Sequence, residues 1–259
     1  TGLDYSGDHV ITYGPDFEVY ADLNVAADGK NSFIKKTLKT NSFQKDYSKK
    51  ALVLTFSHSL NHNNTAYEFF YKNGPLAILP MQKKNNEHNS SIVWTNENNY
   101  IDSLSKVDTS TLISILNEGT KNIIGDVKKI YTMQAFPLSA HLNTRFYEKR
   151  TIYIGDSAHS VHPIAGQGWN LGMKDIETFL EISQKYKSLG IDLGSKFFCK
   201  EYHDNSFYRA YRLYLLTDKL DSLFQNESSL IYLGRSLGMK TIQLNKKLKN
   251  KISDFAMGF

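Results

Sequence analysis

The segment that most constrains the fold runs from Thr151 to Asp175. Residues 151–154 predict a buried strand, Gly155 and Asp156 follow it directly, and a glycine-rich loop then leads into a helix. A strand that ends in such a loop before a helix is typical of open α/β folds, which bind ligands at the carboxyl edge of the sheet. Apolar spacing predicts that the inward face of this helix carries Ile176, Phe179, Leu180 and Ser183.

The loop itself indicates the kind of ligand. A carboxylate at position 156 can accept hydrogen bonds from sugar or polyol hydroxyls, but it is a poor partner for a phosphate. Pro163 and the spaced glycines 166, 168 and 172 let the backbone approach a flat ligand closely. The free N–H groups and positive dipole end of the following helix would stabilise electron-rich ring atoms.

Two other interpretations of this segment stay open. Asp156 with His159 and His162 could ligate a metal, and the glycines could serve only loop geometry and close packing. The two histidines could also assist proton movement or be structural. The second interpretation does not explain why eight residues of this segment match one fixed spacing together. These residues are Gly155, Asp156, His159, Pro163, Gly166, Gly168, Asn170 and Asp175.

The rest of the chain predicts a second layer. Residues 9–13 and 17–22 predict a β-hairpin, and the polar stretch 31–50 predicts a crossover. Residues 40–140 are strand-rich, with a helix that Asp108 caps at its start, so they predict an antiparallel sheet that forms its own layer. We expect His58 and His62 to be solvated, and residues 194–259 to be largely helical.

Composition excludes several classes. The 259 residues are 41% hydrophobic and 22% charged, which is ordinary for a globular protein. A single cysteine, Cys199, excludes an internal disulfide and a cysteine-cluster metal site. No apolar run reaches the roughly 18 residues that a membrane-spanning helix needs. The formal net charge is +5, but no basic stripe suggests a nucleic-acid partner.

The positive charge is concentrated at the C-terminal end. Residues 240–259 hold five lysines and one aspartate, so they carry +4 of the net charge, and they also contain the apolar Phe255, Met257 and Phe259. This end could be a solvated helix face, or a docking surface for anionic lipid or an acidic partner. Its basic residues are Lys240, Lys246, Lys247, Lys249 and Lys251.

Four stretches together resemble a known family. Residues 155–175 resemble the second flavin-binding motif of aromatic hydroxylases similar to p-hydroxybenzoate hydroxylase, and residues 22–32 (DLNVAADGKNS) resemble the Asp-Gly motif of that family. Residues 66–81 and 92–95 look like the substrate-domain strands of ubiquinone-biosynthesis hydroxylases. Residues 217–224 with 233–238 resemble their C-terminal helices. The stretches occur in the family's order over nearly the whole chain.

The resemblance implies a specific architecture. We expect an α/β protein with a partial Rossmann-type FAD-binding domain, interrupted by an antiparallel substrate domain and followed by helices. By analogy, residues 1–40 end the first FAD-binding segment and 41–137 form the substrate domain. Residues 138–185 then form the second FAD-binding segment, and 186–259 form a C-terminal helical region.

The resemblance also implies roles for individual residues. Asp156 matches an aspartate that contacts the ribityl chain or pyrophosphate region of FAD, and Pro163 matches a proline whose carbonyl faces the flavin. Asp28 matches a residue that serves FAD and NAD(P)H binding, in part by holding structure, and the alternative for Asp28-Gly29 is an ordinary turn after a strand. The resemblance implies no catalytic side chain and no metal. The expected cofactor-binding residues are Asp28, Gly155, Asp156, Pro163, Gly166, Gln167, Gly168, Trp169, Asn170, Leu171 and Gly172.

The implied function is that of an FAD-dependent monooxygenase. It would use NAD(P)H and O2 to hydroxylate the aromatic ring of a polyprenyl phenol in ubiquinone biosynthesis, within a biosynthetic complex. The expected location is cytoplasmic and peripheral at the inner membrane. One alternative is a flavin hydroxylase of a small soluble phenol. Another is a non-catalytic subunit that binds a prenyl lipid or serves as a scaffold.

One element of the family pattern is missing. The family begins with a glycine-rich turn that cradles the FAD pyrophosphate, and no GxGxxG occurs in this sequence. Because the sequence starts at Thr1, we expect an N-terminally truncated chain. The complete protein is then expected to bind FAD, and this fragment alone to be inactive.

Overall fold

The computed structural model describes residues 2–84, 86–226 and 228–257, without the side chains of residues 121, 165 and 255–257. It divides into two compact units, each with its own core. Unit 1 comprises Thr1–Lys45, Ser139–Leu220 and Arg235–Phe259, and unit 2 comprises Asp46–Leu138 and Asp221–Gly234. Which of the predicted segments bind FAD and which bind substrate remains a prediction.

Unit 1 begins with a meander of three short strands. β1 (Gly2–Ser6), β2 (His9–Tyr13) and β3 (Glu18–Ala21) pair antiparallel, and β2 and β3 form the predicted hairpin. A second small sheet has the order β10-β11-β4 and contains β4 (Asn24–Ala26), β10 (Tyr147–Glu148) and β11 (Thr151–Tyr153). β4 and β11 are parallel, with Ala26 opposite Tyr153, so their carboxyl ends lie at the same edge.

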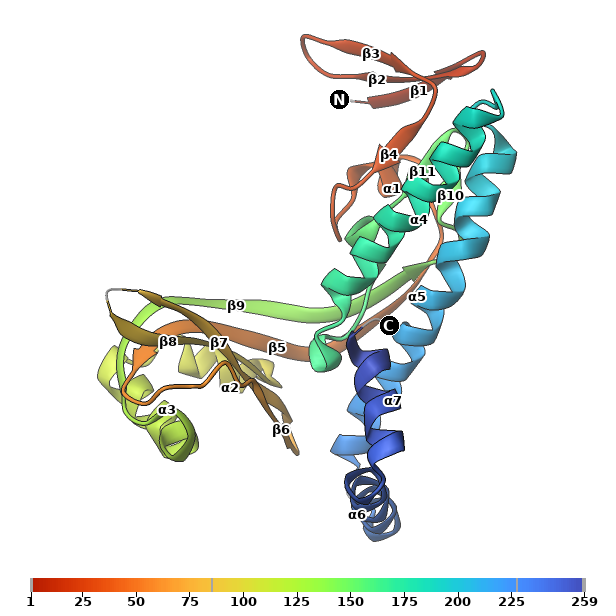
Figure 1. Cartoon of the computed structure of the whole chain (residues 1–259). Coiled ribbons are helices and arrows are strands. Elements are labelled where there is room, and N and C mark those ends of the chain that lie inside the picture. Colours follow the sequence, from red (N-terminus) through yellow and green to blue (C-terminus); the bar gives the residue numbers. More distant parts are fainter. Residues whose placement is uncertain (1, 85, 227, 258–259) are drawn as a thin grey trace. The chain divides into compact units, whose positions relative to one another are not determined.

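The helices of unit 1 cover this sheet (Figure 1). α1 (Phe33–Thr37) follows β4, and the short 3₁₀ turns η1 (Gly155–Ser157) and η2 (Pro163–Ala165) flank β12 (His159–Ser160). α4 (Gly168–Ser188) and α5 (Lys196–Gln225) run side by side and share the unit 1 core. α6 (Ser229–Leu244) and α7 (Lys246–Met257) follow.

Unit 2 is built on the strands β9, β5, β8, β7 and β6 of a large antiparallel sheet, whose order is β12-β9-β5-β8-β7-β6 and whose β12 belongs to unit 1. Its strands include β5 (Ser42–His58), β6 (Tyr67–Tyr71), β7 (Gly74–Lys84), β8 (Glu87–Glu97) and β9 (Val127–Asn143). The long strands β5 and β9 contribute residues to both units. α2 (Asn98–Leu104) and α3 (Thr109–Ile124) pack their buried apolar residues against one face of the sheet.

The structure confirms the predicted α/β class with an antiparallel sheet layer. The cap of α3 is also confirmed, because the Asp108 carboxylate accepts a hydrogen bond of 3.0 Å from the backbone N–H of Thr111. The predicted crossover over 31–50 is wrong in its second half. β5 already begins at Ser42. A polar stretch can form a strand here because side chains on one face of the strand are partly buried while those on the other face are exposed.

Two predictions of burial are also wrong. His58 and His62 are 1% and 8% exposed rather than solvated. The ring of His58 donates from Nδ1 to the carbonyl of Ile124 (3.1 Å) and bonds through Nε2 to the hydroxyl of Ser90 (2.9 Å). These tertiary partners replace water, so burial costs the imidazole little.

Candidate functional site

The site is the loop between β11 and α4, at the edge where the parallel strands β4 and β11 end. The backbone N–H of Ile154 continues the pairing by donating to the carbonyl of Ala26 (3.0 Å). The Ser157 hydroxyl donates to the same carbonyl and so ties η1 to β4. Asp28 lies two residues after Ala26, and Asp156 lies three residues after Tyr153, so both follow the ends of adjacent strands.

Both aspartates carry exposed side chains. Asp28 accepts a hydrogen bond of 3.2 Å from the N–H of Ile34 in α1. Asp156 has no hydrogen-bond partner among the residues that the structure describes, so its carboxylate is available to a ligand. This is the position in which a carboxylate can accept hydrogen bonds from hydroxyl groups.

The glycines of the loop fall into two groups. Gly155 and Gly166 both have φ of +60°, a conformation that favours glycine. A Cβ at Gly166 or Gly168 would meet no atom within 4 Å, so internal packing does not require a glycine at either position. Gly172 differs, because its Cβ would lie 3.6 Å from the Cα of Gly155. The open space beside 166 and 168 is suited to a ligand that approaches the backbone.

The first turn of α4 completes the loop. The N–H of Leu171 bonds to the carbonyl of Gln167, which leaves the N–H groups of residues 168–170 without intrahelical acceptors. The Asn170 amide donates to Oε1 of Gln167 (3.2 Å), while Trp169 is 78% exposed. Leu171 is buried in the core, so only its backbone could face a ligand. Pro163, at the start of η2, is exposed.

A buried polar network beneath the loop holds it in place. Asp175 is fully buried, and its Oδ2 accepts hydrogen bonds from the N–H of Gly155 (3.1 Å) and Nε2 of His159 (2.6 Å). Its Oδ1 accepts from Arg209 of α5 at 3.5 Å, and Arg209 also donates to the hydroxyl of Thr178 (3.2 Å). His159 therefore binds Asp175, and the network positions the glycine turn rather than lining the loop surface.

This network also corrects the predicted inward face of α4. Ile176 and Leu180 are 41% and 51% exposed, and Phe179 is only partly buried. The buried face includes Asp175 and Thr178, because these polar residues bond to the loop and to α5. Apolar spacing alone does not identify such residues. The buried residues of α4 are Leu171, Asp175, Thr178, Ile182, Ser183 and Tyr186.

Sequence reasoning missed two residues near the loop. Arg209 lies 34 residues beyond Asp175, on a helix whose pattern gave no sign of a polar contact. His141 in β9 lies opposite Ser160 of β12 and is 4% exposed. Burial, with the nearby positive charge of Lys35, lowers the pKa of His141 to about 3, so its ring is neutral.

Comparison with known proteins identifies the class. Residues 10–181 match the family model described as FAD binding domain, so the chain belongs to this FAD-binding family. The open glycine loop and the accessible Asp156 fit that cofactor. The predicted family and the predicted FAD cofactor are confirmed, while the roles of the individual site residues stay predictions.

Its relatives are more specific. The chain is 31% identical to ubiquinone hydroxylase UbiL of Rhodospirillum rubrum, over 93% of this chain and 55% of that protein. It is 30% identical to ubiquinone hydroxylase UbiM of Neisseria meningitidis, over 85% of this chain and 47% of that protein. The chain thus spans about half the length of these curated relatives.

Solved structures support the fold. The p-nitrophenol 4-monooxygenase PnpA of Pseudomonas putida superposes with a TM-score of 0.74 at 16% identity. The match covers 98% of this chain and 64% of that one. At this identity the likeness concerns the fold alone.

Proposed function

We propose that the complete protein is an FAD-dependent monooxygenase that hydroxylates the aromatic ring of a polyprenyl phenol in ubiquinone biosynthesis. The observation that carries the proposal is the 31% identity to a ubiquinone hydroxylase over 93% of the chain. The overall reaction would join one oxygen atom of O2 to the ring and release the other as water. NAD(P)H would supply the two electrons and become NAD(P)⁺.

FAD, when bound, would supply the oxygen chemistry, and the protein supplies position and electrostatics. In this proposal Asp156 accepts hydrogen bonds from the hydroxyl-bearing part of the cofactor. The backbone from Gly166 to Gly172 lies beside the ring, and the free N–H groups at the start of α4 stabilise negative charge on it. Asp28 supports the same edge from β4. The backbone carbonyl of Pro163 faces the ring.

The activity can be tested on the complete protein with matched substrates. We expect NAD(P)H oxidation and a product heavier by one oxygen atom with a short-chain polyprenyl phenol, and much less product with a soluble hydroxybenzoate. Equal turnover of the two would favour a hydroxylase of small soluble phenols. A protein that binds prenyl phenol but neither binds FAD nor oxidises NAD(P)H would favour the non-catalytic subunit.

The role of Asp156 can be tested by cofactor titration. We expect Asp156→Ala to weaken FAD binding roughly ten- to a hundred-fold, because one hydrogen bond to a charged group contributes on the order of 1.5–3 kcal/mol. The side chain is exposed, so the fold stays intact. FAD fluorescence quenching would give both dissociation constants.

Asp16→Ala serves as the control, because this exposed aspartate lies in the β2–β3 turn away from the loop. Equal FAD affinities of Asp156→Ala and the wild type would show that Asp156 does not contact the cofactor. Gly168→Val tests the neighbouring backbone by filling its open space with a branched side chain.

We further propose that α6 and α7 hold the protein at an anionic membrane surface, where a prenyl chain partitions. Within the described residues, none of the helices is long and apolar enough to cross a bilayer. α6 buries no residue, and its Leu237 and Leu244 are 57% and 82% exposed. Side chains of Phe255, Met257 and Phe259, expected to add apolar contact, lie outside the described part. The exposed basic residues are Lys240, Lys246, Lys247, Lys249 and Lys251.

This docking is expected to be reversible and sensitive to salt. Each lysine near an anionic surface contributes about 1 kcal/mol at most, and salt screens that attraction. We expect co-sedimentation with anionic vesicles at low salt, and its loss at high salt or with neutral vesicles. Replacing the four lysines of α7 by glutamine should abolish co-sedimentation with anionic vesicles at low salt. Sedimentation that ignores lipid charge would contradict the docking but not the FAD assignment.

A further inference from the structure

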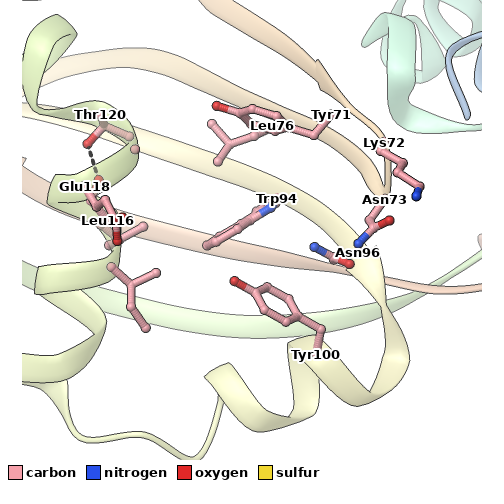
Figure 2. A pocket seen from close by; sticks show the side chains of 12 residues that line it. Tyr71, Lys72, Asn73, Leu76, Trp94, Asn96, Tyr100, Leu116, Glu118 and Thr120 are labelled. Carbon is pink, nitrogen blue, oxygen red and sulfur yellow. Dashed lines mark hydrogen bonds between the residues drawn. The ribbon is translucent and has the colours of Figure 1, made fainter.

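Unit 2 contains a pocket of about 450 Å³ that the cofactor loop does not contribute to. It lies between the sheet and the helices α2 and α3, and all of its lining residues belong to 71–120. Figure 2 shows side chains from the β6–β7 turn, β8, α2 and α3 around one space. Its volume lies in the range of sites for small molecules.

The walls of this pocket are apolar and aromatic. Leu76 of β7 and Leu116 of α3 are 5% and 1% exposed and form its deep side. Trp94 of β8 and Tyr100 of α2 meet edge to face, with ring centroids 5.6 Å apart and an interplanar angle of 68°. The face of either ring is a surface against which another ring can pack.

Two uncharged donors face this space. The Oδ1 atom of Asn96 accepts a hydrogen bond of 2.8 Å from the N–H of Glu97, which fixes the amide and turns its NH₂ group toward Trp94 (Figure 2). The indole nitrogen of Trp94 lies on the side of its ring nearest that amide. Among the described residues, neither donor has a hydrogen-bond partner.

We propose that this pocket binds a neutral, flat aromatic ring that carries a carbonyl oxygen, such as an aryl ketone or a quinone. The ring would pack against Trp94 and Tyr100, and the carbonyl oxygen would accept hydrogen bonds from the two donors. A cation would meet these donors unfavourably. One cation, Lys72, and one carboxylate, Glu118, line the pocket, so their charges offset each other and an anion gains no net attraction for losing its water.

Three probes of similar shape separate the parts of this proposal. Acetophenone is flat and carries a carbonyl, α-methylstyrene replaces the carbonyl oxygen by CH₂, and benzoate replaces the methyl group by a charged oxygen. The chain has two tryptophans, Trp94 and Trp169, so a ¹⁵N-labelled sample gives two indole N–H signals, and Trp169→Phe assigns them. No FAD or NAD(P)H is added, so the result does not depend on the proposed hydroxylase activity.

We expect acetophenone to shift the Trp94 indole signal saturably and to leave the Trp169 signal in place. The other two probes should bind about tenfold more weakly, since α-methylstyrene lacks the accepting oxygen and benzoate must lose the water around its charged carboxylate. Saturation-transfer measurements on the ligand should show a similar loss for Trp94→Phe. Asn96→Asp should also lose affinity, because it keeps the acceptor for Glu97 but replaces the donor by a negatively charged oxygen, which repels the carbonyl oxygen of the ligand.

Asn99→Asp is the matched control, because Asn99 is exposed on α2 outside the pocket lining, and this change should leave binding unaltered. A Trp94 signal that does not move would overturn the proposal. So would equal affinities of acetophenone and α-methylstyrene, because the donors would then play no part. A shift of the Trp169 signal alone would place binding at the cofactor loop and would also refute the pocket.

Discussion

Replacing Asp175 by alanine is expected to lower the free energy of unfolding by about 3–5 kcal/mol, because it breaks a buried polar network from its centre. The carboxylate is fully buried and accepts hydrogen bonds from Gly155, His159 and Arg209. Without it, the N–H of Gly155 and the buried ring of His159 lose this acceptor, and Arg209 keeps only Thr178. The turn at Gly155, which precedes Asp156, loses its anchor to α4.

Chemical denaturation followed by circular dichroism would measure this loss. Asp175→Asn keeps the size of the side chain and one carbonyl oxygen, so it should be less destabilising than the alanine variant. Asp16→Ala removes the same group from an exposed position and should change stability by less than about 0.5 kcal/mol. If Asp175→Ala unfolds like Asp16→Ala, the network does not stabilise the fold.

The second large effect is a loss of stability in acid that depends on His141. Burial lowers the pKa of this imidazole to about 3 in the folded protein, against about 6.5 in an unfolded chain. Between these values the unfolded state binds more protons, so folding stability falls as pH decreases from about 6.5 toward 3. At pH 5 the expected loss from this residue alone is about 2 kcal/mol.

The measurement compares unfolding free energies at pH 7.5 and pH 5 for two variants. His141→Phe keeps a buried ring but cannot bind a proton, so its stability should fall less on acidification than that of the wild type. Asn99→Phe introduces the same ring at an exposed position without changing a titratable group, so it should retain the wild-type dependence. Identical pH profiles of wild type and His141→Phe would show that His141 does not resist protonation in the fold.

The conformation of the loop was predictable from the sequence because it depends on local spacing. Thr151–Tyr153 form a strand, Gly155 and Gly166 adopt positive φ, and α4 begins at Gly168, all within one continuous segment. Strand, turn and helix signals of this kind act between near neighbours along the chain. The same locality made the cap of α3 at Asp108 predictable.

The tertiary structure decided which side chains are buried. Asp175 faces inward because Arg209 and the Gly155 turn surround it, and His58 is buried because Ile124 and Ser90 satisfy its ring. These partners lie 20 to 66 residues away along the chain. The sequence by itself determined the strand–loop–helix segment and the family. Only the packed fold determined the network beneath the loop, the neutral His141 and the pocket at Trp94, because polar burial depends on partners that no local pattern encodes.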